Sequence, residues 1–297
     1  MSRDIKTIAI LYPGEMGAAL AAVLRGRGLR VVTTLEGRSA GTASRARAAG
    51  LEVLNSLAEV VRAADVVISV ALPDAAEDIA RAYCAQARHA PARAIYVDAN
   101  SISPESASAI GAMITAAGRS FVDAAINGLA RNLTTSGTLF LSGDRAAEVA
   151  ALFGDAVRVK QLGSESGAAS SMKMLLGGMS KGLCGLFLEL ALVAERRGML
   201  DEMLTACDAI YPGMQHVIDR MLPTYAQHAP RRAAEMRELE STAQAAGVEP
   251  CVLDAVRRLH ELLANESFNP ASGADVRSIV RHLQAAGLLS GSESNAV

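Results

Sequence analysis

The first half of the sequence alternates short β-like runs with helix-like runs, and this alternation constrains the fold more than any other feature. The strand-like runs are KTIAIL (6–11), RVVTTL, LEVL, DVVISVAL, AIYVDAN, SFVDAAI, GTLFLSG and VRVKQLG (157–163). Helix-like segments such as MGAALAAVLRGRG (16–28) and LAEVVRAA (57–64) separate most of them. Strands separated by helices predict a parallel, doubly wound sheet. The almost continuous apolar run 65–72 is typical of a central strand that is covered on both faces.

The second half of the sequence is helical. From about residue 165 the strand-like runs stop, and a long helical pattern begins at SGAASSMKM. Later helical runs are broken at Pro212–Gly213, Pro223, Pro230, Pro250 and Pro270. We therefore expect two domains, an α/β domain at 1–164 and an all-α domain at 165–290, with a long helix between them. The polar tail GSESNAV is expected to fray.

Composition excludes several classes of function. The 297 residues carry a net charge of −2, which gives no electrostatic footprint for nucleic acid or an anionic membrane. The four cysteines are widely spaced without a CxxC pair, so we expect reduced thiols, no disulfide and no metal site. These cysteines are Cys84, Cys184, Cys207 and Cys251.

Nothing in the apolar segments predicts targeting or a membrane span. The stretch MSRDIKTIAIL reads as the start of a strand rather than a signal peptide. The most apolar later stretch, 174–194, contains Lys181 and Glu189 and is too charged to span a bilayer comfortably. We predict a cytoplasmic protein.

The turn LYPGEMG (11–17) joins the first strand to the first helix, which is the place of a dinucleotide-binding loop in a Rossmann-type domain. Gly14 and Gly17 fill the second and third glycine positions, which serve close approach to a pyrophosphate and helix–strand packing. Tyr12 stands in the first position, so an ordinary βα turn is the alternative. The candidate cofactor contacts here are Tyr12, Pro13, Gly14, Glu15, Met16 and Gly17, with the anion on the free N–H groups of the helix.

The residues after the second strand indicate which cofactor is bound, because in such domains they lie beside its ribose. Glu36 suits the ribose hydroxyls of NAD, whereas Arg38 and Ser39 both donate hydrogen bonds and suit the 2′-phosphate of NADP. We favour NADP and keep NAD as the alternative. A solvated surface pair is the non-functional interpretation.

Four further stretches resemble the β-hydroxyacid dehydrogenases. VALPDAAEDIA (70–80) resembles the segment after their fourth strand, and DANSISP (98–104) resembles their D-x-S-T-I-S-P segment. FVDAAINGLARNLTTSGTLFLSGD (121–144) resembles their substrate segment, and GSESGAASSMKM (163–174) resembles the segment with their catalytic lysine. The resemblance covers about residues 1–200 convincingly. Within this superfamily, which includes 6-phosphogluconate and 3-hydroxyisobutyrate dehydrogenases, the chain looks closest to a bacterial branch with a divergent helical C-terminal domain.

The resemblance implies roles for individual residues. It makes Lys173 the catalytic lysine and Ser101, Asn127 and Gly128 substrate contacts. The cofactor contacts that it adds, at the nicotinamide end, are Leu72, Pro73, Asn100 and Ser101.

The chain also departs from the family pattern. Gly177 occupies the slot of the substrate asparagine, Asn127 that of a serine, and Ser180 that of the acidic residue used in decarboxylation. We therefore do not expect oxidative decarboxylation of 6-phosphogluconate, and the substrate differs from 3-hydroxyisobutyrate. A Lys-Asp pair of the relatives is replaced by alanines. Arg232 with Glu235 is a candidate substitute for that pair, with a solvated salt bridge as the alternative.

The surroundings of Lys173 support a role in proton transfer without the family. Its neighbours in sequence are apolar, so we expect a buried helix that lowers the pKa of the lysine and lets it exchange a proton near neutral pH. A snorkelling lysine at a domain edge is the alternative. Lys181 lies about 12 Å further along the helix and is a candidate for an anionic group of the substrate.

Together these observations predict an NAD(P)-dependent oxidoreductase that interconverts a small (β-)hydroxycarboxylic acid and its keto or aldehyde form. An imine reductase is the second hypothesis, although such enzymes generally lack the lysine. A non-catalytic NADP-binding protein is the third. The expected partners are a small anionic substrate and a second copy of the chain, joined through the helical domain.

Overall fold

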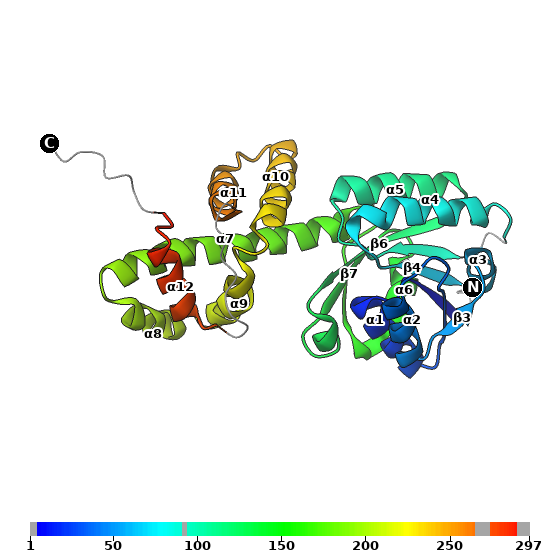
Figure 1. The fold of residues 1–297 in the computed structure, drawn as a ribbon. Helices are drawn as coiled ribbons and strands as arrows, with labels where there is room; N and C mark the ends of the chain where they lie inside the picture. The colour runs from blue at the N-terminus through cyan, green and yellow to red at the C-terminus, as the bar shows by residue number, and fades with distance from the viewer. Residues whose placement is uncertain (1–4, 91–93, 265–273, 290–297) are drawn as a thin grey trace. The chain divides into compact units, whose positions relative to one another are not determined.

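The computed structural model describes residues 5–90, 94–264 and 274–289, and the chain divides into two compact units, Met1–Lys173 and Met174–Val297. The first unit is a sheet covered by helices and the second is entirely helical in its described part (Figure 1). The sequence places the boundary between 164 and 165, whereas the two units divide inside the long helix α7 (Ala168–Arg196). Pro270, one of the predicted breaks, lies outside the described residues.

Each predicted strand-like run forms a strand of one eight-stranded sheet in the order β3-β2-β1-β4-β5-β6-β7-β8. Their bounds are β1 Thr7–Leu11, β2 Arg30–Thr34, β3 Glu52–Leu54, β4 Val66–Ser69, β5 Ile95–Asp98, β6 Ser120–Asn127, β7 Thr138–Ser142 and β8 Arg158–Gln161. The strands from β3 to β6 in this order run parallel. The order reverses direction at β1, so the carboxyl ends of β1 and β4 meet at a topological switch point, where such sheets bind ligands.

Alternation along β1 explains the two layers of helices. Ile8 and Ile10 point into one apolar cluster, and Ala9 and Leu11 point into the other, as the two-residue period of a strand requires. The first cluster is closed by α1 and α6, and the second by α3, α4 and α5 (Figure 1). The helices of this unit are α1 Glu15–Gly26, α2 Ala40–Ala48, α3 Leu57–Ala63, α4 Ala76–Ala87, α5 Pro104–Ala116 and α6 Ala146–Phe153.

The direction of β7 differs from the prediction of a wholly parallel sheet. β7 pairs antiparallel with β6, with Asn127 opposite Thr138, and β8 runs parallel to β7. The connection between β6 and β7 contains only the short 3₁₀ turn η2 (Ala130–Asn132). A parallel neighbour needs a crossover of a dozen or more residues, whereas a tight connection returns the chain antiparallel.

The helical unit continues α7 with α8 (Leu200–Ile210), α9 (Met214–Met221), the 3₁₀ turn η4 (Leu222–Thr224), α10 (Ala229–Ala245), α11 (Cys251–Ala264) and α12 (Val276–Ala285). Pro223 and Pro230 stand in the first turn of η4 and of α10, where a missing N–H costs nothing. One face of α7, with Cys184, Phe187 and Leu188, packs into the core of this unit.

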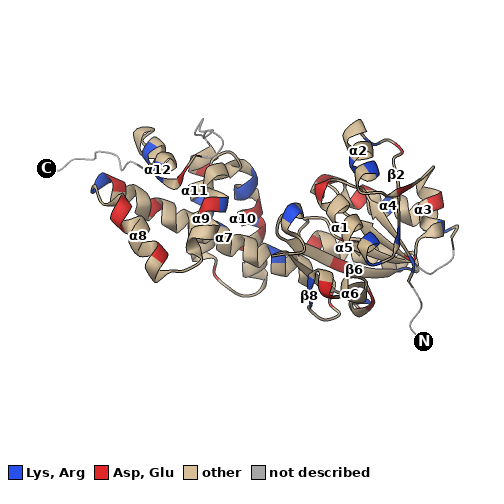
Figure 2. Cartoon of the chain, turned by 90° about the horizontal axis from the view of Figure 1, so that it is seen from below, with Lys and Arg blue, Asp and Glu red and all other residues tan. Residues whose placement is uncertain are grey.

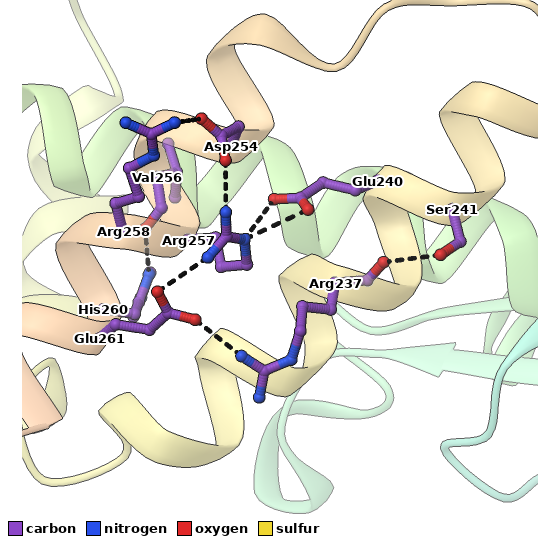
Figure 3. A network of polar contacts seen from close by, with 9 residues as sticks. All are labelled: Arg237, Glu240, Ser241, Asp254, Val256, Arg257, Arg258, His260 and Glu261. Atoms are coloured by element: carbon purple, nitrogen blue, oxygen red, sulfur yellow. Dashed lines mark hydrogen bonds and ion pairs between the residues drawn. The ribbon is translucent and has the colours of Figure 1, made fainter.

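Arg257 ties α10 to α11 (Figure 3). Its guanidinium donates to Glu240 at 2.9 Å and to Glu261 at 2.8 Å, and it also pairs with Asp254. His260 is buried beside this network, and its Nδ1 lies 2.8 Å from the carbonyl oxygen of Val256. Burial lowers the pKa of His260 to about 4, so its ring is neutral near pH 7. These contacts indicate that His260 has a structural role in the helical unit.

Both units carry charged residues of both signs. Figure 2 shows acidic and basic residues interspersed on the helices of each unit, as expected for a net charge of −2. Among the described residues, α7 is the one helix that is long and apolar enough to cross a membrane, with a mean hydropathy of 1.5. Since 44% of that window is buried within the protein, α7 equally fits the description of a core helix and is weak evidence for a span. The cytoplasmic location stays a prediction.

Candidate active site

The turn after β1 leaves the start of α1 open to a ligand. Gly14 is the N-cap residue, and as a glycine it has no side chain to accept a hydrogen bond from the first turn of α1. A Cβ built on Gly14 meets nothing within 4 Å, so the space beside this residue is open. Such a helix start binds an anion through its free donors and its dipole. These residues therefore fit the pyrophosphate of a dinucleotide.

Gly17 is required for packing. A Cβ at this position would lie 2.8 Å from the carbonyl oxygen of Tyr12 and 3.1 Å from Ile10. Because the first of these atoms is backbone, a larger residue would displace α1 from β1. Gly17 thus gives the close helix–strand approach that the third fingerprint glycine provides.

Tyr12 lies beneath a guanidinium. The Cζ of Arg38 is 4.3 Å from the centre of the Tyr12 ring, a cation–π contact that the sequence analysis missed. Burial raises the pKa of Tyr12, while nearby Arg38 opposes the shift and Glu36 adds to it. Ser39 is the N-cap of α2, and its hydroxyl accepts from the N–H of Thr42 at 3.2 Å. The Nε of Arg45, also missed, donates to the carbonyl oxygen of Pro13 at 3.3 Å.

Asn100 follows β5, at the carboxyl edge where it was predicted, and its side chain has protein partners. It is buried, and its amide connects the ends of β4 and β5: its Oδ1 accepts from the N–H of Ala71 at 2.6 Å, and its Nδ2 donates to Ser69 at 3.0 Å and to Asp98 at 2.9 Å. The side chain is thereby committed to protein partners. Its role is to hold the neighbouring loops, and direct contact with the nicotinamide is not expected. Leu72, predicted beside it, is 77% exposed.

Asp98 is a buried carboxylate at the end of β5. Its Oδ1 accepts from the backbone N–H and the amide of Asn100, whereas its Oδ2 has no hydrogen-bond partner among the described residues. Burial raises the pKa of Asp98 to about 6, even though the hydrogen bonds from Asn100 oppose the shift. Burial therefore destabilises the charged form of Asp98, and such a shifted pKa is more typical of functional sites than of structural cores.

Lys173 reaches the carboxyl edge of the sheet. Its Nζ donates to the hydroxyl of Ser101 at 2.6 Å, and Ser101 follows β5. The pair joins the residue predicted as the proton carrier to a residue predicted at the nicotinamide end. The lysine is partly exposed, and the pKa lowering expected from burial stays a prediction.

A second buried carboxylate anchors the start of α7. Asp123 on β6 accepts from the backbone N–H of Ser170 at 2.9 Å and from its hydroxyl at 2.7 Å. Ser142 on β7 accepts from the N–H of Ala169 at 3.2 Å. These bonds fix the first turn of α7 on the sheet, and so place Lys173. The sequence analysis did not single out Asp98 and Asp123. Each is an acidic residue inside an apolar strand, and this pattern could have identified them, because a buried carboxylate needs hydrogen-bond partners.

The predicted substrate loop lies at the same edge. Asn127 ends β6 and is exposed, and Gly128 follows with a φ of +134°, a conformation that glycine tolerates best. A Cβ on Gly128 would lie 3.0 Å from the Cα of Gly137 across the loop. The predicted residues of the first unit thus follow the carboxyl ends of β1, β2, β4, β5 and β6, and Lys173 reaches the same edge from α7.

The predicted residues of the second unit have protein partners. Lys181 is buried, and its Nζ lies 3.0 Å from Glu235; a Cβ on Gly177 would be 3.3 Å from that nitrogen. Arg232 is buried and donates to the carbonyl oxygen of Thr224 at 2.9 Å. The predicted pairing of Arg232 with Glu235 is therefore wrong: the ion pairs of Glu235 are with Lys181 and with Arg231, one turn before it on α10.

Comparison with known protein families agrees with this geometry. Residues 7–153 match the NAD binding domain of 6-phosphogluconate dehydrogenase, and residues 194–263 match a domain of unknown function, DUF1932. A solved conserved protein of unknown function, described as structurally similar to 3-hydroxyacid dehydrogenases, is 32% identical with a TM-score of 0.70. The match covers 86% of this chain and 96% of that one.

Two enzymes of known activity share the fold at lower identity. The 3-hydroxyisobutyrate dehydrogenase of Mycobacterium tuberculosis, solved with L-serine, is 20% identical with a TM-score of 0.72, over 95% of this chain and 100% of that one. An imine reductase from Myxococcus stipitatus, solved with NADP⁺, is 19% identical with a TM-score of 0.58, over 93% and 99%. With the open start of α1 and the matched domains, the chain belongs to the β-hydroxyacid dehydrogenase and 6-phosphogluconate dehydrogenase-like superfamily of NAD(P)-dependent oxidoreductases.

Proposed function

We propose that the protein interconverts a small (β-)hydroxycarboxylic acid and its keto or aldehyde form by hydride transfer, with Lys173 as general acid/base. The observation that carries the proposal is the 2.6 Å hydrogen bond from Lys173 Nζ to Ser101 Oγ at the carboxyl edge of the cofactor-binding unit. Oxidation of an alcohol requires a group that takes the hydroxyl proton as the hydride leaves. A lysine amine beside a hydroxyl provides that group.

The residues divide the reaction between them. Bound nicotinamide supplies the hydride acceptor or donor. In oxidation, neutral Lys173 takes the proton of the substrate hydroxyl; in reduction, its ammonium polarises the carbonyl and returns the proton. Ser101 orients the lysine and, with Asn127 and Gly128, binds polar groups of the substrate. Lys181 and Arg232 have partners in their own unit and are assigned to its structure.

The preferred cofactor on this proposal is NADP. Arg38 lies on Tyr12 at the end of β2 and presents a cation where a 2′-phosphate binds in such domains. Glu36 on the same turn keeps NAD as the alternative, because a carboxylate accepts from the ribose hydroxyls.

A thermal-shift titration with NAD, NADP and their reduced forms tests the proposal, followed by absorbance at the reduced nicotinamide band with a panel of hydroxy acids. We expect dinucleotide to raise the Tm, since a ligand at about a hundred times its Kd stabilises the native state by about 2.7 kcal/mol. Gly14→Ala is the matched control: the open space around Gly14 predicts an unchanged Tm without ligand and a smaller shift with it.

The same panel separates the rival functions. Hydride transfer to a cyclic imine but to no keto or aldehyde acid would favour the imine reductase hypothesis. Binding of dinucleotide without turnover of any compound would favour a non-catalytic protein. Absence of any dinucleotide-induced shift would contradict all three.

We also propose a homodimer through the helical unit, carried by an exposed apolar stripe on α7. The expectation that α7 is buried on nearly all sides is wrong for the single chain, because this stripe is between 37% and 65% exposed. The stripe consists of Leu176, Met179, Leu183, Leu186, Leu190 and Val193. Its spacing alternates between three and four residues, the heptad pattern that packs one helix against another. A second copy presents the same stripe, so in a symmetric dimer the two stripes bury each other.

Light scattering with size-exclusion chromatography tests the dimer. We expect a mass of about twice the 30.9 kDa of one chain, and a single-chain mass for Met179→Glu combined with Leu186→Glu, because charges in an apolar seam are costly. Val252→Glu, at an exposed apolar position of α11 outside the stripe, should stay dimeric. A single-chain mass for the unmodified protein would refute the proposal.

A further inference from the structure

Tyr12 is the residue that breaks the dinucleotide fingerprint, and the structure gives it a partner. It occupies the first glycine position, and its ring packs partly against the apolar cluster under α3 and α4. The ring also contacts Arg38, whose guanidinium carbon lies 4.3 Å from the ring centre. A bare glycine at position 12 would give Arg38 no such surface.

The backbone around Arg38 limits where its side chain starts. The N–H of Arg38 donates to the carbonyl oxygen of Leu35 at 2.9 Å, closing a tight turn with Gly37 at a φ of +69°. Directly afterwards, Ser39 caps α2. The side chain is long and exposed, so these constraints fix its base but not its tip. Two contacts hold the tip: the Tyr12 ring, and a hydrogen bond of 3.4 Å that the Nε of Arg38 donates to the carbonyl oxygen of Glu36.

Stacking leaves a guanidinium able to bind a phosphate. The guanidinium carbon of Arg38 lies over the ring and its Nε donates to Glu36, so its terminal N–H groups are the ones that can donate to phosphate oxygens. A 2′-phosphate carries about two negative charges at neutral pH. The unphosphorylated ribose of NAD has no such group and gains little from a preset guanidinium.

We propose that Tyr12 is a positioning residue for cofactor choice: its ring holds Arg38 ready for the 2′-phosphate and so gives the protein its preference for NADP over NAD. This inference rests on the proposed dinucleotide site. It explains the aromatic residue at a glycine position as a gain in selectivity. Glu36 on the same turn opposes the phosphate, which makes a fixed cation the more necessary.

Titration calorimetry with NADP and NAD tests the inference on Tyr12→Phe, Tyr12→Leu, Arg38→Ala and the Tyr12→Leu/Arg38→Ala double variant. Phenylalanine keeps the aromatic face, whereas leucine keeps apolar bulk without it. We expect Tyr12→Leu to weaken NADP about two- to fivefold more than it weakens NAD, in line with an exposed cation–π contact. Tyr12→Phe should match the unmodified protein. Arg38→Ala should weaken NADP about ten- to a hundredfold, as loss of charge-assisted hydrogen bonds does.

The double variant decides whether Tyr12 acts through Arg38. In the Arg38→Ala background, Tyr12→Leu should have no further effect on the ratio of the NADP and NAD affinities. An equal loss of both cofactors in Tyr12→Leu, or an undiminished effect without Arg38, would overturn the inference. Because the ratio is measured on one sample, partial unfolding of a variant lowers both signals together and leaves the ratio intact. If the unmodified protein binds neither dinucleotide, the proposed function fails instead.

Discussion

Replacing Lys173 by alanine is expected to lower kcat by about 10²- to 10⁴-fold, the range that a positioned general acid/base contributes. The Kd for dinucleotide should stay near that of the unmodified protein, because the pyrophosphate donors belong to the start of α1. The proton of the substrate then has no acceptor at the position that Lys173 Nζ occupies beside Ser101. Steady-state rates measure kcat, and calorimetry measures the Kd.

Lys160→Ala is the matched control for this prediction. Lys160 is an exposed lysine on β8, so its removal changes the net charge equally without touching the site. Loss of dinucleotide affinity together with kcat in Lys173→Ala would point to a structural role. Unchanged turnover would refute the assignment of Lys173.

Relative to the unmodified protein, Asp98→Asn is expected to gain about 3 kcal/mol in the free energy of unfolding between pH 4 and pH 7. The pKa of Asp98 is about 6 in the folded chain against 3.8 for the ordinary group, and each pKa unit is worth about 1.4 kcal/mol. Asparagine keeps an oxygen for Asn100 and removes the buried charge. The unpartnered Oδ2 is then replaced by a neutral amide nitrogen.

The sign of the pH dependence follows from the same shift. Between about pH 4 and 6 the folded chain holds a proton on Asp98 that the unfolded chain has lost, so the stability of the unmodified protein falls as pH rises through this window. The variant should match the unmodified protein near pH 4 and exceed it above pH 6. Urea unfolding across this range measures the difference, with exposed Asp155→Asn as a control. A difference independent of pH would show that Asp98 is not the titrating group.

Much of the first unit follows from the sequence because a parallel sheet imposes local patterns. Buried strands are mostly apolar, and the helices of the doubly wound part other than α4 end near a glycine or begin at a capping residue. The direction of β7 was wrong, since the apolar pattern of a strand is the same in either direction. Only the length of the connection after Asn127 distinguishes the two, and it is too short for a crossover.

The site was less predictable because it depends on contacts between distant residues. The positions of Gly14, Gly17 and Lys173 follow from motif spacing, and their geometry fits the expected chemistry. The Tyr12–Arg38 stack joins two loops, and no local pattern encodes which side chains meet there. Arg232 shows the converse error: helical spacing favoured Glu235, but burial turned the guanidinium towards Thr224.

The point at which the chain divides has a consequence for how this superfamily diversifies. The first compact unit ends at Lys173, so the first turn of α7 belongs to the cofactor unit through Asp123 and Ser170. On our proposal, every group that handles hydride and proton is inherited on one continuous stretch of gene. The remainder, including the stretch that matches a domain of unknown function, carries none of the groups that this proposal assigns to hydride and proton transfer. Chimaeras joined just after residue 173 would therefore be expected to alter assembly while they retain the parental cofactor.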